Sequence, residues 1–203
     1  MHALVLSCTL KRSPERSNSE ALARVMMNEF ERAHVSSELV RLVDLNILPG
    51  VESDQGHGDD WPHVRRKLLA SNILLVATPT WLGQASSVCQ RMLERMDAMI
   101  SESKRGGAPV AFGKVAGVVI TGNEDGAHHI VATTCQALID IGFTIPAQSW
   151  TYWHLGPGPG PNYLDTRRAH AYSHRTGRNA ARNLVAVAKA LRAHPLPIPE
   201  RGK

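Results

Sequence analysis

The sequence has few cysteines, few aromatic side chains and no long apolar run. Its three cysteines, Cys8, Cys89 and Cys135, lie far apart and form no CxxC pair. This spacing argues against a disulfide framework, a zinc cluster or a compact set of iron–sulfur ligands. No segment approaches the roughly 18 apolar residues of a membrane span, and the apolar start lacks the features of a signal peptide. We therefore expect a cytoplasmic protein with reduced thiols and no membrane segment.

Acidic side chains are scarce in the C-terminal part of the chain. Residues 1–125 hold 14 basic and 15 acidic side chains, whereas residues 126–203 hold 9 basic and 3 acidic ones, and the formal net charge is +5. Such asymmetry can mark an anionic partner. The arginines from Arg167 onward are not interleaved with aromatic residues, and no nucleic-acid motif is present. Nucleic acid is therefore a disfavoured partner, and an amphipathic final helix with solvated arginines is the simpler interpretation.

Apolar runs alternate with helical patterns along the chain. The runs cover residues 3–8, 37–42, 72–78 and 115–121, with a weaker fifth run at 142–150. Apolar side chains recur at helical spacing within 18–33, 59–70, 88–100, 127–141 and 166–193. Near-continuous apolar strands joined by helices predict a parallel sheet covered on both faces. We expect an α/β fold, a three-layer sandwich with a five-stranded parallel sheet, whose ligand lies beyond the carboxyl ends of the strands.

The length of 203 residues suits one domain. Its core is expected at about 1–150, followed by a Gly/Pro-rich arm at 151–165 and a C-terminal helix at 166–193. The long polar connection at 43–62 is a candidate lid or interface. The "GPGPGP" segment (156–161) is not a dinucleotide site, because its prolines lack N–H donors and no strand-to-helix turn frames it. We interpret it as a stiff spacer that carries the last helix, or an arm, across a neighbouring surface.

The loop after the first strand is rich in hydroxyl groups and cations. Ser17 and Glu20 form a capping-box pattern, which predicts a helix that begins near Asn18. The free N–H groups and the positive dipole end of a helix favour a phosphate. An ordinary cap on a solvated loop is the alternative, and the absence of a GxxxxGK[ST] pattern argues against a nucleoside triphosphatase. The polar groups of this loop are Ser13, Ser17, Asn18 and Ser19, with Lys11, Arg12 and Arg16 upstream.

Two further loops follow buried strands and complete the predicted site. In "ATPTWLG" (77–83), Pro79 and Gly83 shape a turn, while Trp81 and Leu82 offer a flat apolar surface. In "TGNEDGAHH" (121–129), glycines allow tight turns, and the polar side chains between them provide hydrogen-bonding groups. A phosphate end, an apolar wall and a polar rim suit a phosphorylated ligand with a planar heterocycle.

These three loops, in this order, resemble those of the flavodoxin-like NADPH-dependent FMN reductase family. The resemblance covers roughly residues 1–150 and implies a flavodoxin-like sheet, non-covalent FMN, NAD(P)H as co-substrate and a homo-oligomer, often a dimer or tetramer. By position it implies that the phosphate is held by Ser7, Thr9, Ser17, Asn18 and Ser19, with Lys11 among the candidate cations. It implies that the isoalloxazine is bordered on one side by Pro79, Thr80, Trp81, Leu82, Gly83 and Gln84. It implies that the other side of the isoalloxazine is bordered by Gly122, Asn123, Glu124, Asp125 and Gly126.

The function expected from this resemblance is electron transfer through FMN. NAD(P)H would pass a hydride to the flavin, and a quinone, free flavin or other small molecule would accept the electrons. The alternative is a flavodoxin-type electron carrier without its own NAD(P)H turnover. No catalytic triad or metal-ligand spacing is apparent. His128 and His129 are interpreted as capping or surface residues in preference to proton donors. The aromatic residues Trp150, Tyr152 and Trp153 would line a neighbouring subunit's pocket or anchor the tail.

Overall fold

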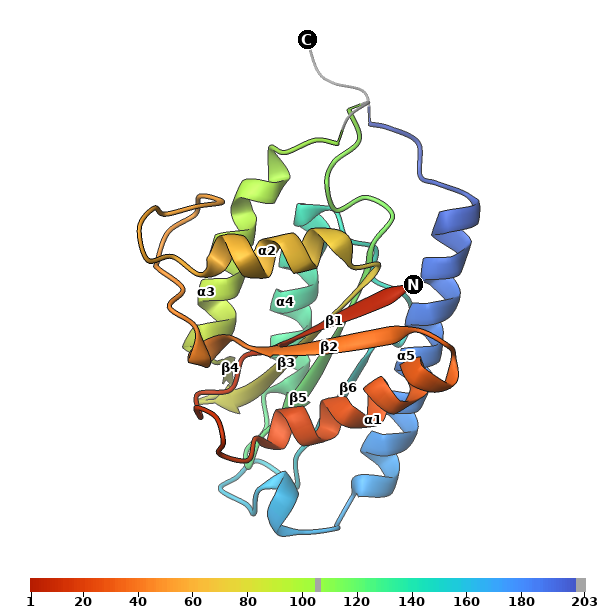
Figure 1. Cartoon of the computed structure of the whole chain (residues 1–203). Coiled ribbons are helices and arrows are strands. Elements are labelled where there is room, and N and C mark those ends of the chain that lie inside the picture. Colours follow the sequence, from red (N-terminus) through yellow and green to blue (C-terminus); the bar gives the residue numbers. More distant parts are fainter. Residues whose placement is uncertain (105–106, 200–203) are drawn as a thin grey trace.

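A parallel sheet between two layers of helices forms the framework of the protein (Figure 1). The computed structural model describes residues 1–104 and 107–199. The strands of the parallel sheet have the order β2-β1-β3-β5-β6, which is the order of flavodoxin-like folds. They are β1 (His2–Ser7), β2 (Ser36–Arg41), β3 (Ile73–Trp81), β5 (Val115–Thr121) and β6 (Trp150–Trp153). The two-residue strand β4 (Gln84–Ala85) pairs antiparallel with the end of β3. The predicted α/β sandwich with five parallel strands is therefore confirmed.

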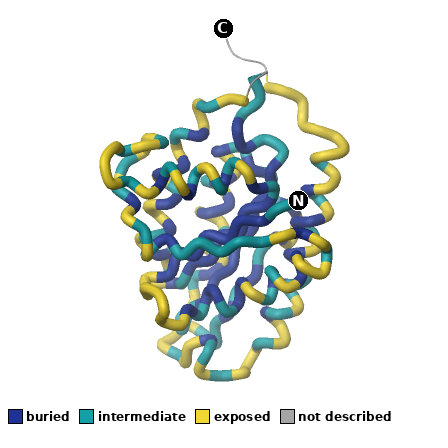
Figure 2. The backbone as a smooth tube through the Cα atoms, viewed as in Figure 1, coloured by how far each residue is buried: buried dark blue, intermediate teal, exposed yellow. Residues whose placement is uncertain are grey.

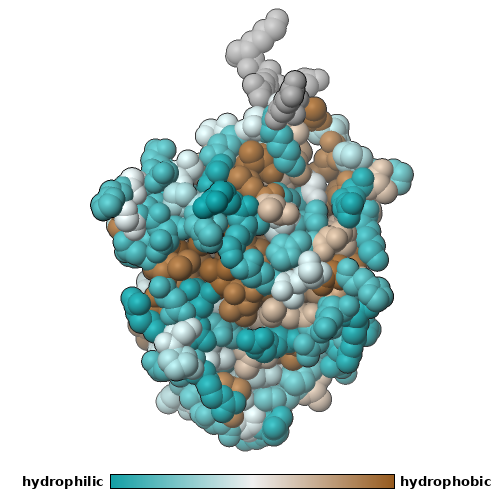
Figure 3. All heavy atoms as spheres, viewed as in Figure 1, coloured by the Kyte–Doolittle hydropathy of each residue, from teal (hydrophilic) through white to brown (hydrophobic). Residues whose placement is uncertain are grey.

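The helices cover both faces of the sheet because successive strand residues point to opposite sides. On one face, Ala3 and Val5 of β1 pack with the helices α1 (Asn18–Arg32) and α5 (His170–Ala193). On the other face, Leu4 and Leu6 pack with α2 (Trp61–Ala70), α3 (Ser87–Met96) and α4 (Ala127–Ile141). The strands β1, β3 and β5 are buried at the centre of the molecule, whereas the edge strand β2 is only half-buried (Figure 2). Hydrophilic atoms cover most of the face seen in Figure 3, and hydrophobic atoms show between α2 and β2.

Within residues 1–104 and 107–199, three short 3-10 turns complete the helical elements. They are η1 (Leu42–Asp44), η2 (Asp97–Ile100) and η3 (Tyr163–Asp165). The turn η2 continues directly from α3, so the apolar pattern expected to form one helix at 88–100 is divided between the two elements.

The fifth strand lies later in the chain than the sequence indicates. We expect it at 142–150, but β6 spans Trp150–Trp153 and pairs with Val118–Thr121 of β5. The preceding segment makes only an isolated bridge between Thr144 and Val115. Pro146 lacks an N–H donor and Gln148 has a φ of 51°, so this segment cannot continue a regular ladder. The aromatic "WTYW" segment therefore completes the sheet.

The long connection at 43–62 is fastened to α3 by a buried ion pair. Arg95 Nη2 lies 2.7 Å from Asp59 Oδ2, and both side chains are fully buried. The same guanidinium donates to the carbonyl oxygens of Leu48 at 2.8 Å and Glu52 at 2.9 Å. It also lies 5.8 Å from the ring centroid of Trp61. This fixed position argues against a mobile lid in this segment.

Candidate functional site

A small cavity opens at the carboxyl ends of β3 and β5, the edge where a parallel α/β sheet binds its ligands. Its volume is about 60 Å³. The residues that line it come from α1, from the ends of both strands and from the arm after β6: Asn18, Pro79, Thr80, Trp81, Thr121, Gly122, Asn123, Asn162 and Tyr163. Four segments that are distant in the sequence therefore meet at one point.

The last residue of β5, Thr121, contributes a buried hydroxyl group to the wall of this cavity. Its Oγ1 atom has no hydrogen-bond partner among the residues that the structure describes. Burying a hydroxyl without a partner costs about 1–3 kcal/mol in proteins. A ligand that supplies a hydrogen-bonding atom at this position would offset that cost. Among the residues that line this cavity, Thr121 is therefore the one whose hydroxyl group suits a polar ligand.

The turn between β3 and β4 presents the apolar part of the site. Leu82 and Gly83 form a two-residue hairpin loop in which both residues have positive φ, 51° and 75°. Trp81 is 53% exposed and Leu82 is 89% exposed. A leucine in the left-handed region costs roughly 1–2 kcal/mol, and its exposure gives no compensating burial. An outlier of this kind at a cavity mouth points to contact with an apolar ligand surface.

The two loops that border the cavity are packed directly against each other. The backbone N–H of Leu82 donates to Glu124 Oε1 at 2.6 Å. A Cβ atom on Gly122 would lie 2.8 Å from Thr80 Cβ, and one on Gly126 would lie 2.6 Å from Gly83 Cα. Glycine is therefore required at both positions if the loops are to approach this closely. These contacts fix the relative position of the two predicted walls.

At the first loop, half of the predicted capping box forms. Ser17 is the N-cap of α1, and its Oγ accepts a hydrogen bond from the N–H of Glu20 at 3.3 Å. The Glu20 carboxylate binds Arg41 instead of the Ser17 N–H, with hydrogen bonds of 2.7 and 2.6 Å, and accepts a third from Ser7 Oγ at 2.7 Å. The hydrogen bond from Arg41 to Glu20 raises the pKa of Arg41 above its usual value. The guanidinium also donates to the Lys11 and Glu15 carbonyls, and this fixes the shape of the loop.

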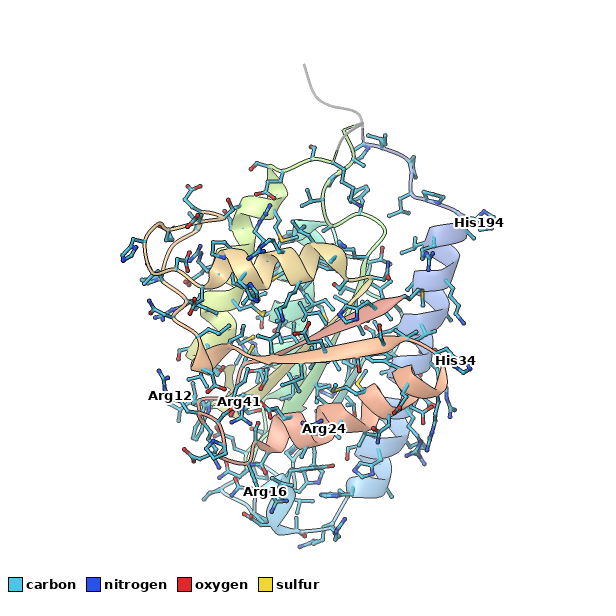
Figure 4. The ribbon with its side chains drawn as sticks, in the orientation of Figure 1. Arg12, Arg16, Arg24, His34, Arg41 and His194 are labelled. Atoms are coloured by element: carbon cyan, nitrogen blue, oxygen red, sulfur yellow. The ribbon has the colours of Figure 1, made fainter. Side chains whose placement is uncertain are left out.

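A second cleft, of about 340 Å³, adjoins the N-terminus of α1 and is lined by Pro14, Glu15, Arg16, Ser17, Glu20, Ala21, Arg24, Arg41 and Leu164. Figure 4 shows Arg12, Arg16 and Arg41 around the β1–α1 loop and Arg24 along α1. In the described part of the chain, the side chains of Arg16 and Arg24 make no hydrogen bond or ion pair. Two unpaired guanidinium groups beside a helix N-terminus are suited to an anion.

The structure brings six of the predicted site residues to the lining of the first cavity: Asn18, Pro79, Thr80, Trp81, Gly122 and Asn123. Leu82, Gly83, Glu124 and Gly126 lie beside it in the two packed loops, and Asp125 is exposed. Gln84 lines the separate cleft between α3 and α4. Ser7, Thr9, Lys11, Ser17 and Ser19 do not line it. Of these, Ser17 lines the second cleft, Ser7 is bound to Glu20, and Thr9 Oγ1 accepts the Lys11 N–H at 3.3 Å. Ser13 is held by Asp44 at 2.6 Å.

Sequence reasoning missed three residues of the cavity lining, Thr121, Asn162 and Tyr163. Thr121 ends an apolar run immediately before the predicted loop, so its position on the wall was available from the strand alternation. Asn162 and Tyr163 lie in the arm, for which the sequence indicated only a spacer. In the structure, the Gly160 N–H donates to the Asn123 carbonyl at 2.7 Å, which folds the arm over the β5–α4 loop.

Comparison with known proteins decides the family. The profile of the NADPH-dependent FMN reductase family matches residues 1–156. The chain belongs to this family. The resemblance drawn from the three loops is confirmed. A flavodoxin from the domain Archaea shares the fold, with a TM-score of 0.57 over 91% of this chain and 97% of that chain, at 13% identity.

Several relatives match nearly the whole chain of this FMN reductase family member. The 8-demethyl-8-aminoriboflavin-5'-phosphate synthase of Streptomyces davaonensis is 32% identical over 209 residues, 96% of this chain and 80% of the relative. A crystal structure of RosB with the bound intermediate 8-demethyl-8-formylriboflavin-5'-phosphate has a TM-score of 0.89 at 30% identity, over 97% of this chain and 82% of that chain. The Divalent metal cation transporter MntH of Mycobacterium bovis is 37% identical over 200 residues, 95% of this chain. The chain spans only 29% of that relative.

The residues at the site fit a flavin phosphate. Thr121 supplies an unpartnered hydroxyl, Trp81 and Leu82 supply an exposed apolar wall, and Arg16 and Arg24 supply free cations. Within the described ranges, no group of three or more His, Cys, Asp or Glu side chains is arranged to hold a metal ion. Likewise, none of the described helices has the length and hydropathy that a membrane crossing needs.

Proposed function

We propose that this protein binds FMN at the carboxyl edge of the sheet and transfers electrons from NAD(P)H to a small acceptor such as a quinone or a free flavin. The observation that carries the proposal is the unpartnered Thr121 hydroxyl, buried in the wall of a cavity beside the exposed Trp81. It supports a ligand that combines a planar apolar ring with polar edges. The bound flavin would supply the hydride and electron chemistry, and the chain would bind and orient it.

Each part of the proposed site has a separate task. The N-terminus of α1, with Ser17, Ser19 and the free guanidinium of Arg16, would bind the phosphate. The Trp81 ring and the Leu82 side chain would pack against the isoalloxazine. The glycine turn at 122–126 would bring backbone N–H groups to the polar edge of the ring system, where they would stabilise negative charge in its reduced form.

A second candidate function treats the flavin as the substrate. The similarity to the Streptomyces synthase and to RosB covers 96% and 97% of this chain, and therefore includes the arm and α5. The family profile ends at residue 156, before most of that region. The name of the synthase and the intermediate bound to RosB both refer to riboflavin phosphates modified at position 8. We therefore also propose chemical modification of a bound riboflavin phosphate as the alternative to electron transfer to an external acceptor.

The two functions differ in the fate of the flavin. The FMN-loaded protein is mixed with NADPH or NADH without oxygen, then with a quinone, and the flavin is recovered for mass spectrometry. Bleaching of the visible flavin absorption, its return with the quinone and an unchanged flavin mass support the reductase. Absence of bleaching by either nucleotide contradicts it and favours an electron carrier. A changed flavin mass supports modification of the flavin itself.

The proposal also retains the cytoplasmic location expected from the cysteine spacing and the lack of a long apolar run. It retains as well the homo-oligomer, either a dimer or a tetramer, that the family resemblance implies. We also propose that residues 1–203 form a single domain, in which the arm and α5 belong to the same folding unit. The contacts between α1 and α5 and the burial of Ala180 and Leu184 in the shared core support it.

A further inference from the structure

The arm after β6 contributes a wall of the cavity that the family core does not supply. Asn162 and Tyr163 line the cavity together with Trp81 and Thr121. Both lie beyond residue 156, where the family profile ends. Their turn, η3, is closed by a capping box between Asn162 and Asp165. It is joined to α1 because the Leu164 N–H donates to Asn18 Oδ1 at 3.1 Å. The arm is therefore part of the site by direct contact.

Tyr163 is held in one orientation from three sides. Its hydroxyl lies 2.7 Å from His174 Nε2 on α5. Its ring stacks on His170 with a centroid distance of 4.1 Å and an interplanar angle of 11°, and meets the edge of Trp153 at 5.6 Å. His170 Nε2 also lies 3.0 Å from the Tyr163 carbonyl oxygen. Because the two histidines are four residues apart, they lie on the same face of α5.

Burial is the main reason that this pair is neutral near pH 7. Burial raises the pKa of Tyr163, and the nearby charge of Arg167 acts in the opposite direction. Burial lowers the pKa of His174, and His170, Arg178 and Arg167 lower it further. Between the neutral phenol of Tyr163 and the neutral imidazole of His174, either group can donate the hydrogen bond. When His174 Nε2–H donates, the phenol keeps its own proton for a ligand.

We propose that Tyr163 is a flavin-contacting residue and that His174 is the positioning residue that fixes the Tyr163 ring and hydroxyl against the ligand. This inference rests on the proposed binding of FMN and extends it to the arm. The cavity of about 60 Å³ is smaller than the roughly 300 Å³ of the smallest usual ligand pockets. The ring system therefore extends beyond the mouth of the cavity, and Tyr163 on the cavity wall meets its face or edge.

The test compares Tyr163→Phe, Tyr163→Ala, His174→Ala and His174→Gln in the full chain. Tyr172→Phe is the matched control, since Tyr172 lies on α5, the helix that carries His174, and is 51% exposed. FMN affinity is measured by flavin fluorescence, the environment of the ring by the visible absorption of bound FMN, and folding by thermal unfolding of the apoprotein. We expect Tyr163→Ala to weaken FMN binding by about tenfold or more, because a stacked or edge-on aromatic contact is lost.

The conservative variants separate positioning from folding. We expect Tyr163→Phe and His174→Ala to shift the visible absorption of bound FMN in the same way while the apoprotein remains folded. His174→Gln retains an amide group for the tyrosine hydroxyl, so it restores the spectrum toward that of the unchanged protein. This inference alone is overturned when FMN affinity and the visible spectrum of bound FMN are the same in Tyr163→Ala, Tyr163→Phe and the Tyr172→Phe control. Failure of the unsubstituted protein to bind FMN overturns the proposed function and this inference together.

Discussion

Replacing Thr121 by valine changes folding and ligand binding in opposite directions. The substitution exchanges the unpartnered Oγ1 for a methyl group of similar size in a residue that is 3% exposed. A buried hydroxyl without a partner costs about 1–3 kcal/mol. The Thr121→Val apoprotein is therefore expected to be more stable by about 1 kcal/mol. If the hydroxyl binds FMN, the same change removes a hydrogen bond worth about 0.5–1.5 kcal/mol and lowers FMN affinity by roughly two- to tenfold.

The chain offers a matched control for this substitution. Thr134 on α4 also has a buried Oγ1 atom that lacks a partner within the described residues, but it lines a different cleft, between α3 and α4. Thr134→Val is expected to raise the stability of the apoprotein to a similar extent and to leave FMN affinity unchanged. Stability is measured by urea unfolding and affinity by titration with FMN. Equal FMN affinity in both variants, or a loss of apoprotein stability in Thr121→Val, would refute the role assigned to Thr121.

Four further predictions concern the buried ion pair and the two loops of the site. Arg95→Met leaves the buried Asp59 carboxylate unpaired and is expected to destabilise the fold by about 3–5 kcal/mol in urea unfolding, whereas the exposed Arg66→Met changes it little. Burial raises the pKa of Asp59, but hydrogen bonds from Arg95 and backbone N–H groups lower it more, from 3.8 to about 2. The stability that Asp59 contributes is therefore present above about pH 4 and is lost as the pH falls toward 2, and Asp59→Asn should remove this dependence. Gly122→Ala places a Cβ atom 2.8 Å from the neighbouring strand and is expected to weaken FMN binding at least tenfold in a fluorescence titration; wild-type affinity would contradict the close approach of the loops. Leu82→Asn relieves the left-handed backbone and should raise apoprotein stability by about 1 kcal/mol while weakening FMN binding, and unchanged binding would exclude Leu82 from the ring contact.

The sheet and four of its strands were predictable because buried parallel strands are nearly continuous apolar runs. The fifth strand was misplaced because β6 is a short aromatic segment at the sheet edge, whereas the preceding segment "GFTI" is more apolar. Local pattern also could not show that Glu20 binds Arg41, because these residues are brought together only when β2 pairs with β1.

The candidate site was predictable where it follows directly from strand ends. The turn with Trp81 and the turn with Gly122 line the cavity as expected, since carboxyl ends of neighbouring parallel strands meet at one edge. The arm was not predictable, because its position depends on individual long-range contacts such as Leu164 to Asn18. Hydrophobic periodicity carries no information about such contacts.

Equilibrium titration of the apoprotein with FMN tests the central claim most directly. Tryptophan and flavin fluorescence are followed together in the unsubstituted protein and in Trp81→Phe, which removes one of four tryptophans. Saturable binding of one FMN per chain, with tryptophan quenching that is reduced in Trp81→Phe, is the predicted result. Absence of binding, or binding whose quenching is unaffected by Trp81→Phe, would contradict a flavin at the carboxyl ends of β3 and β5.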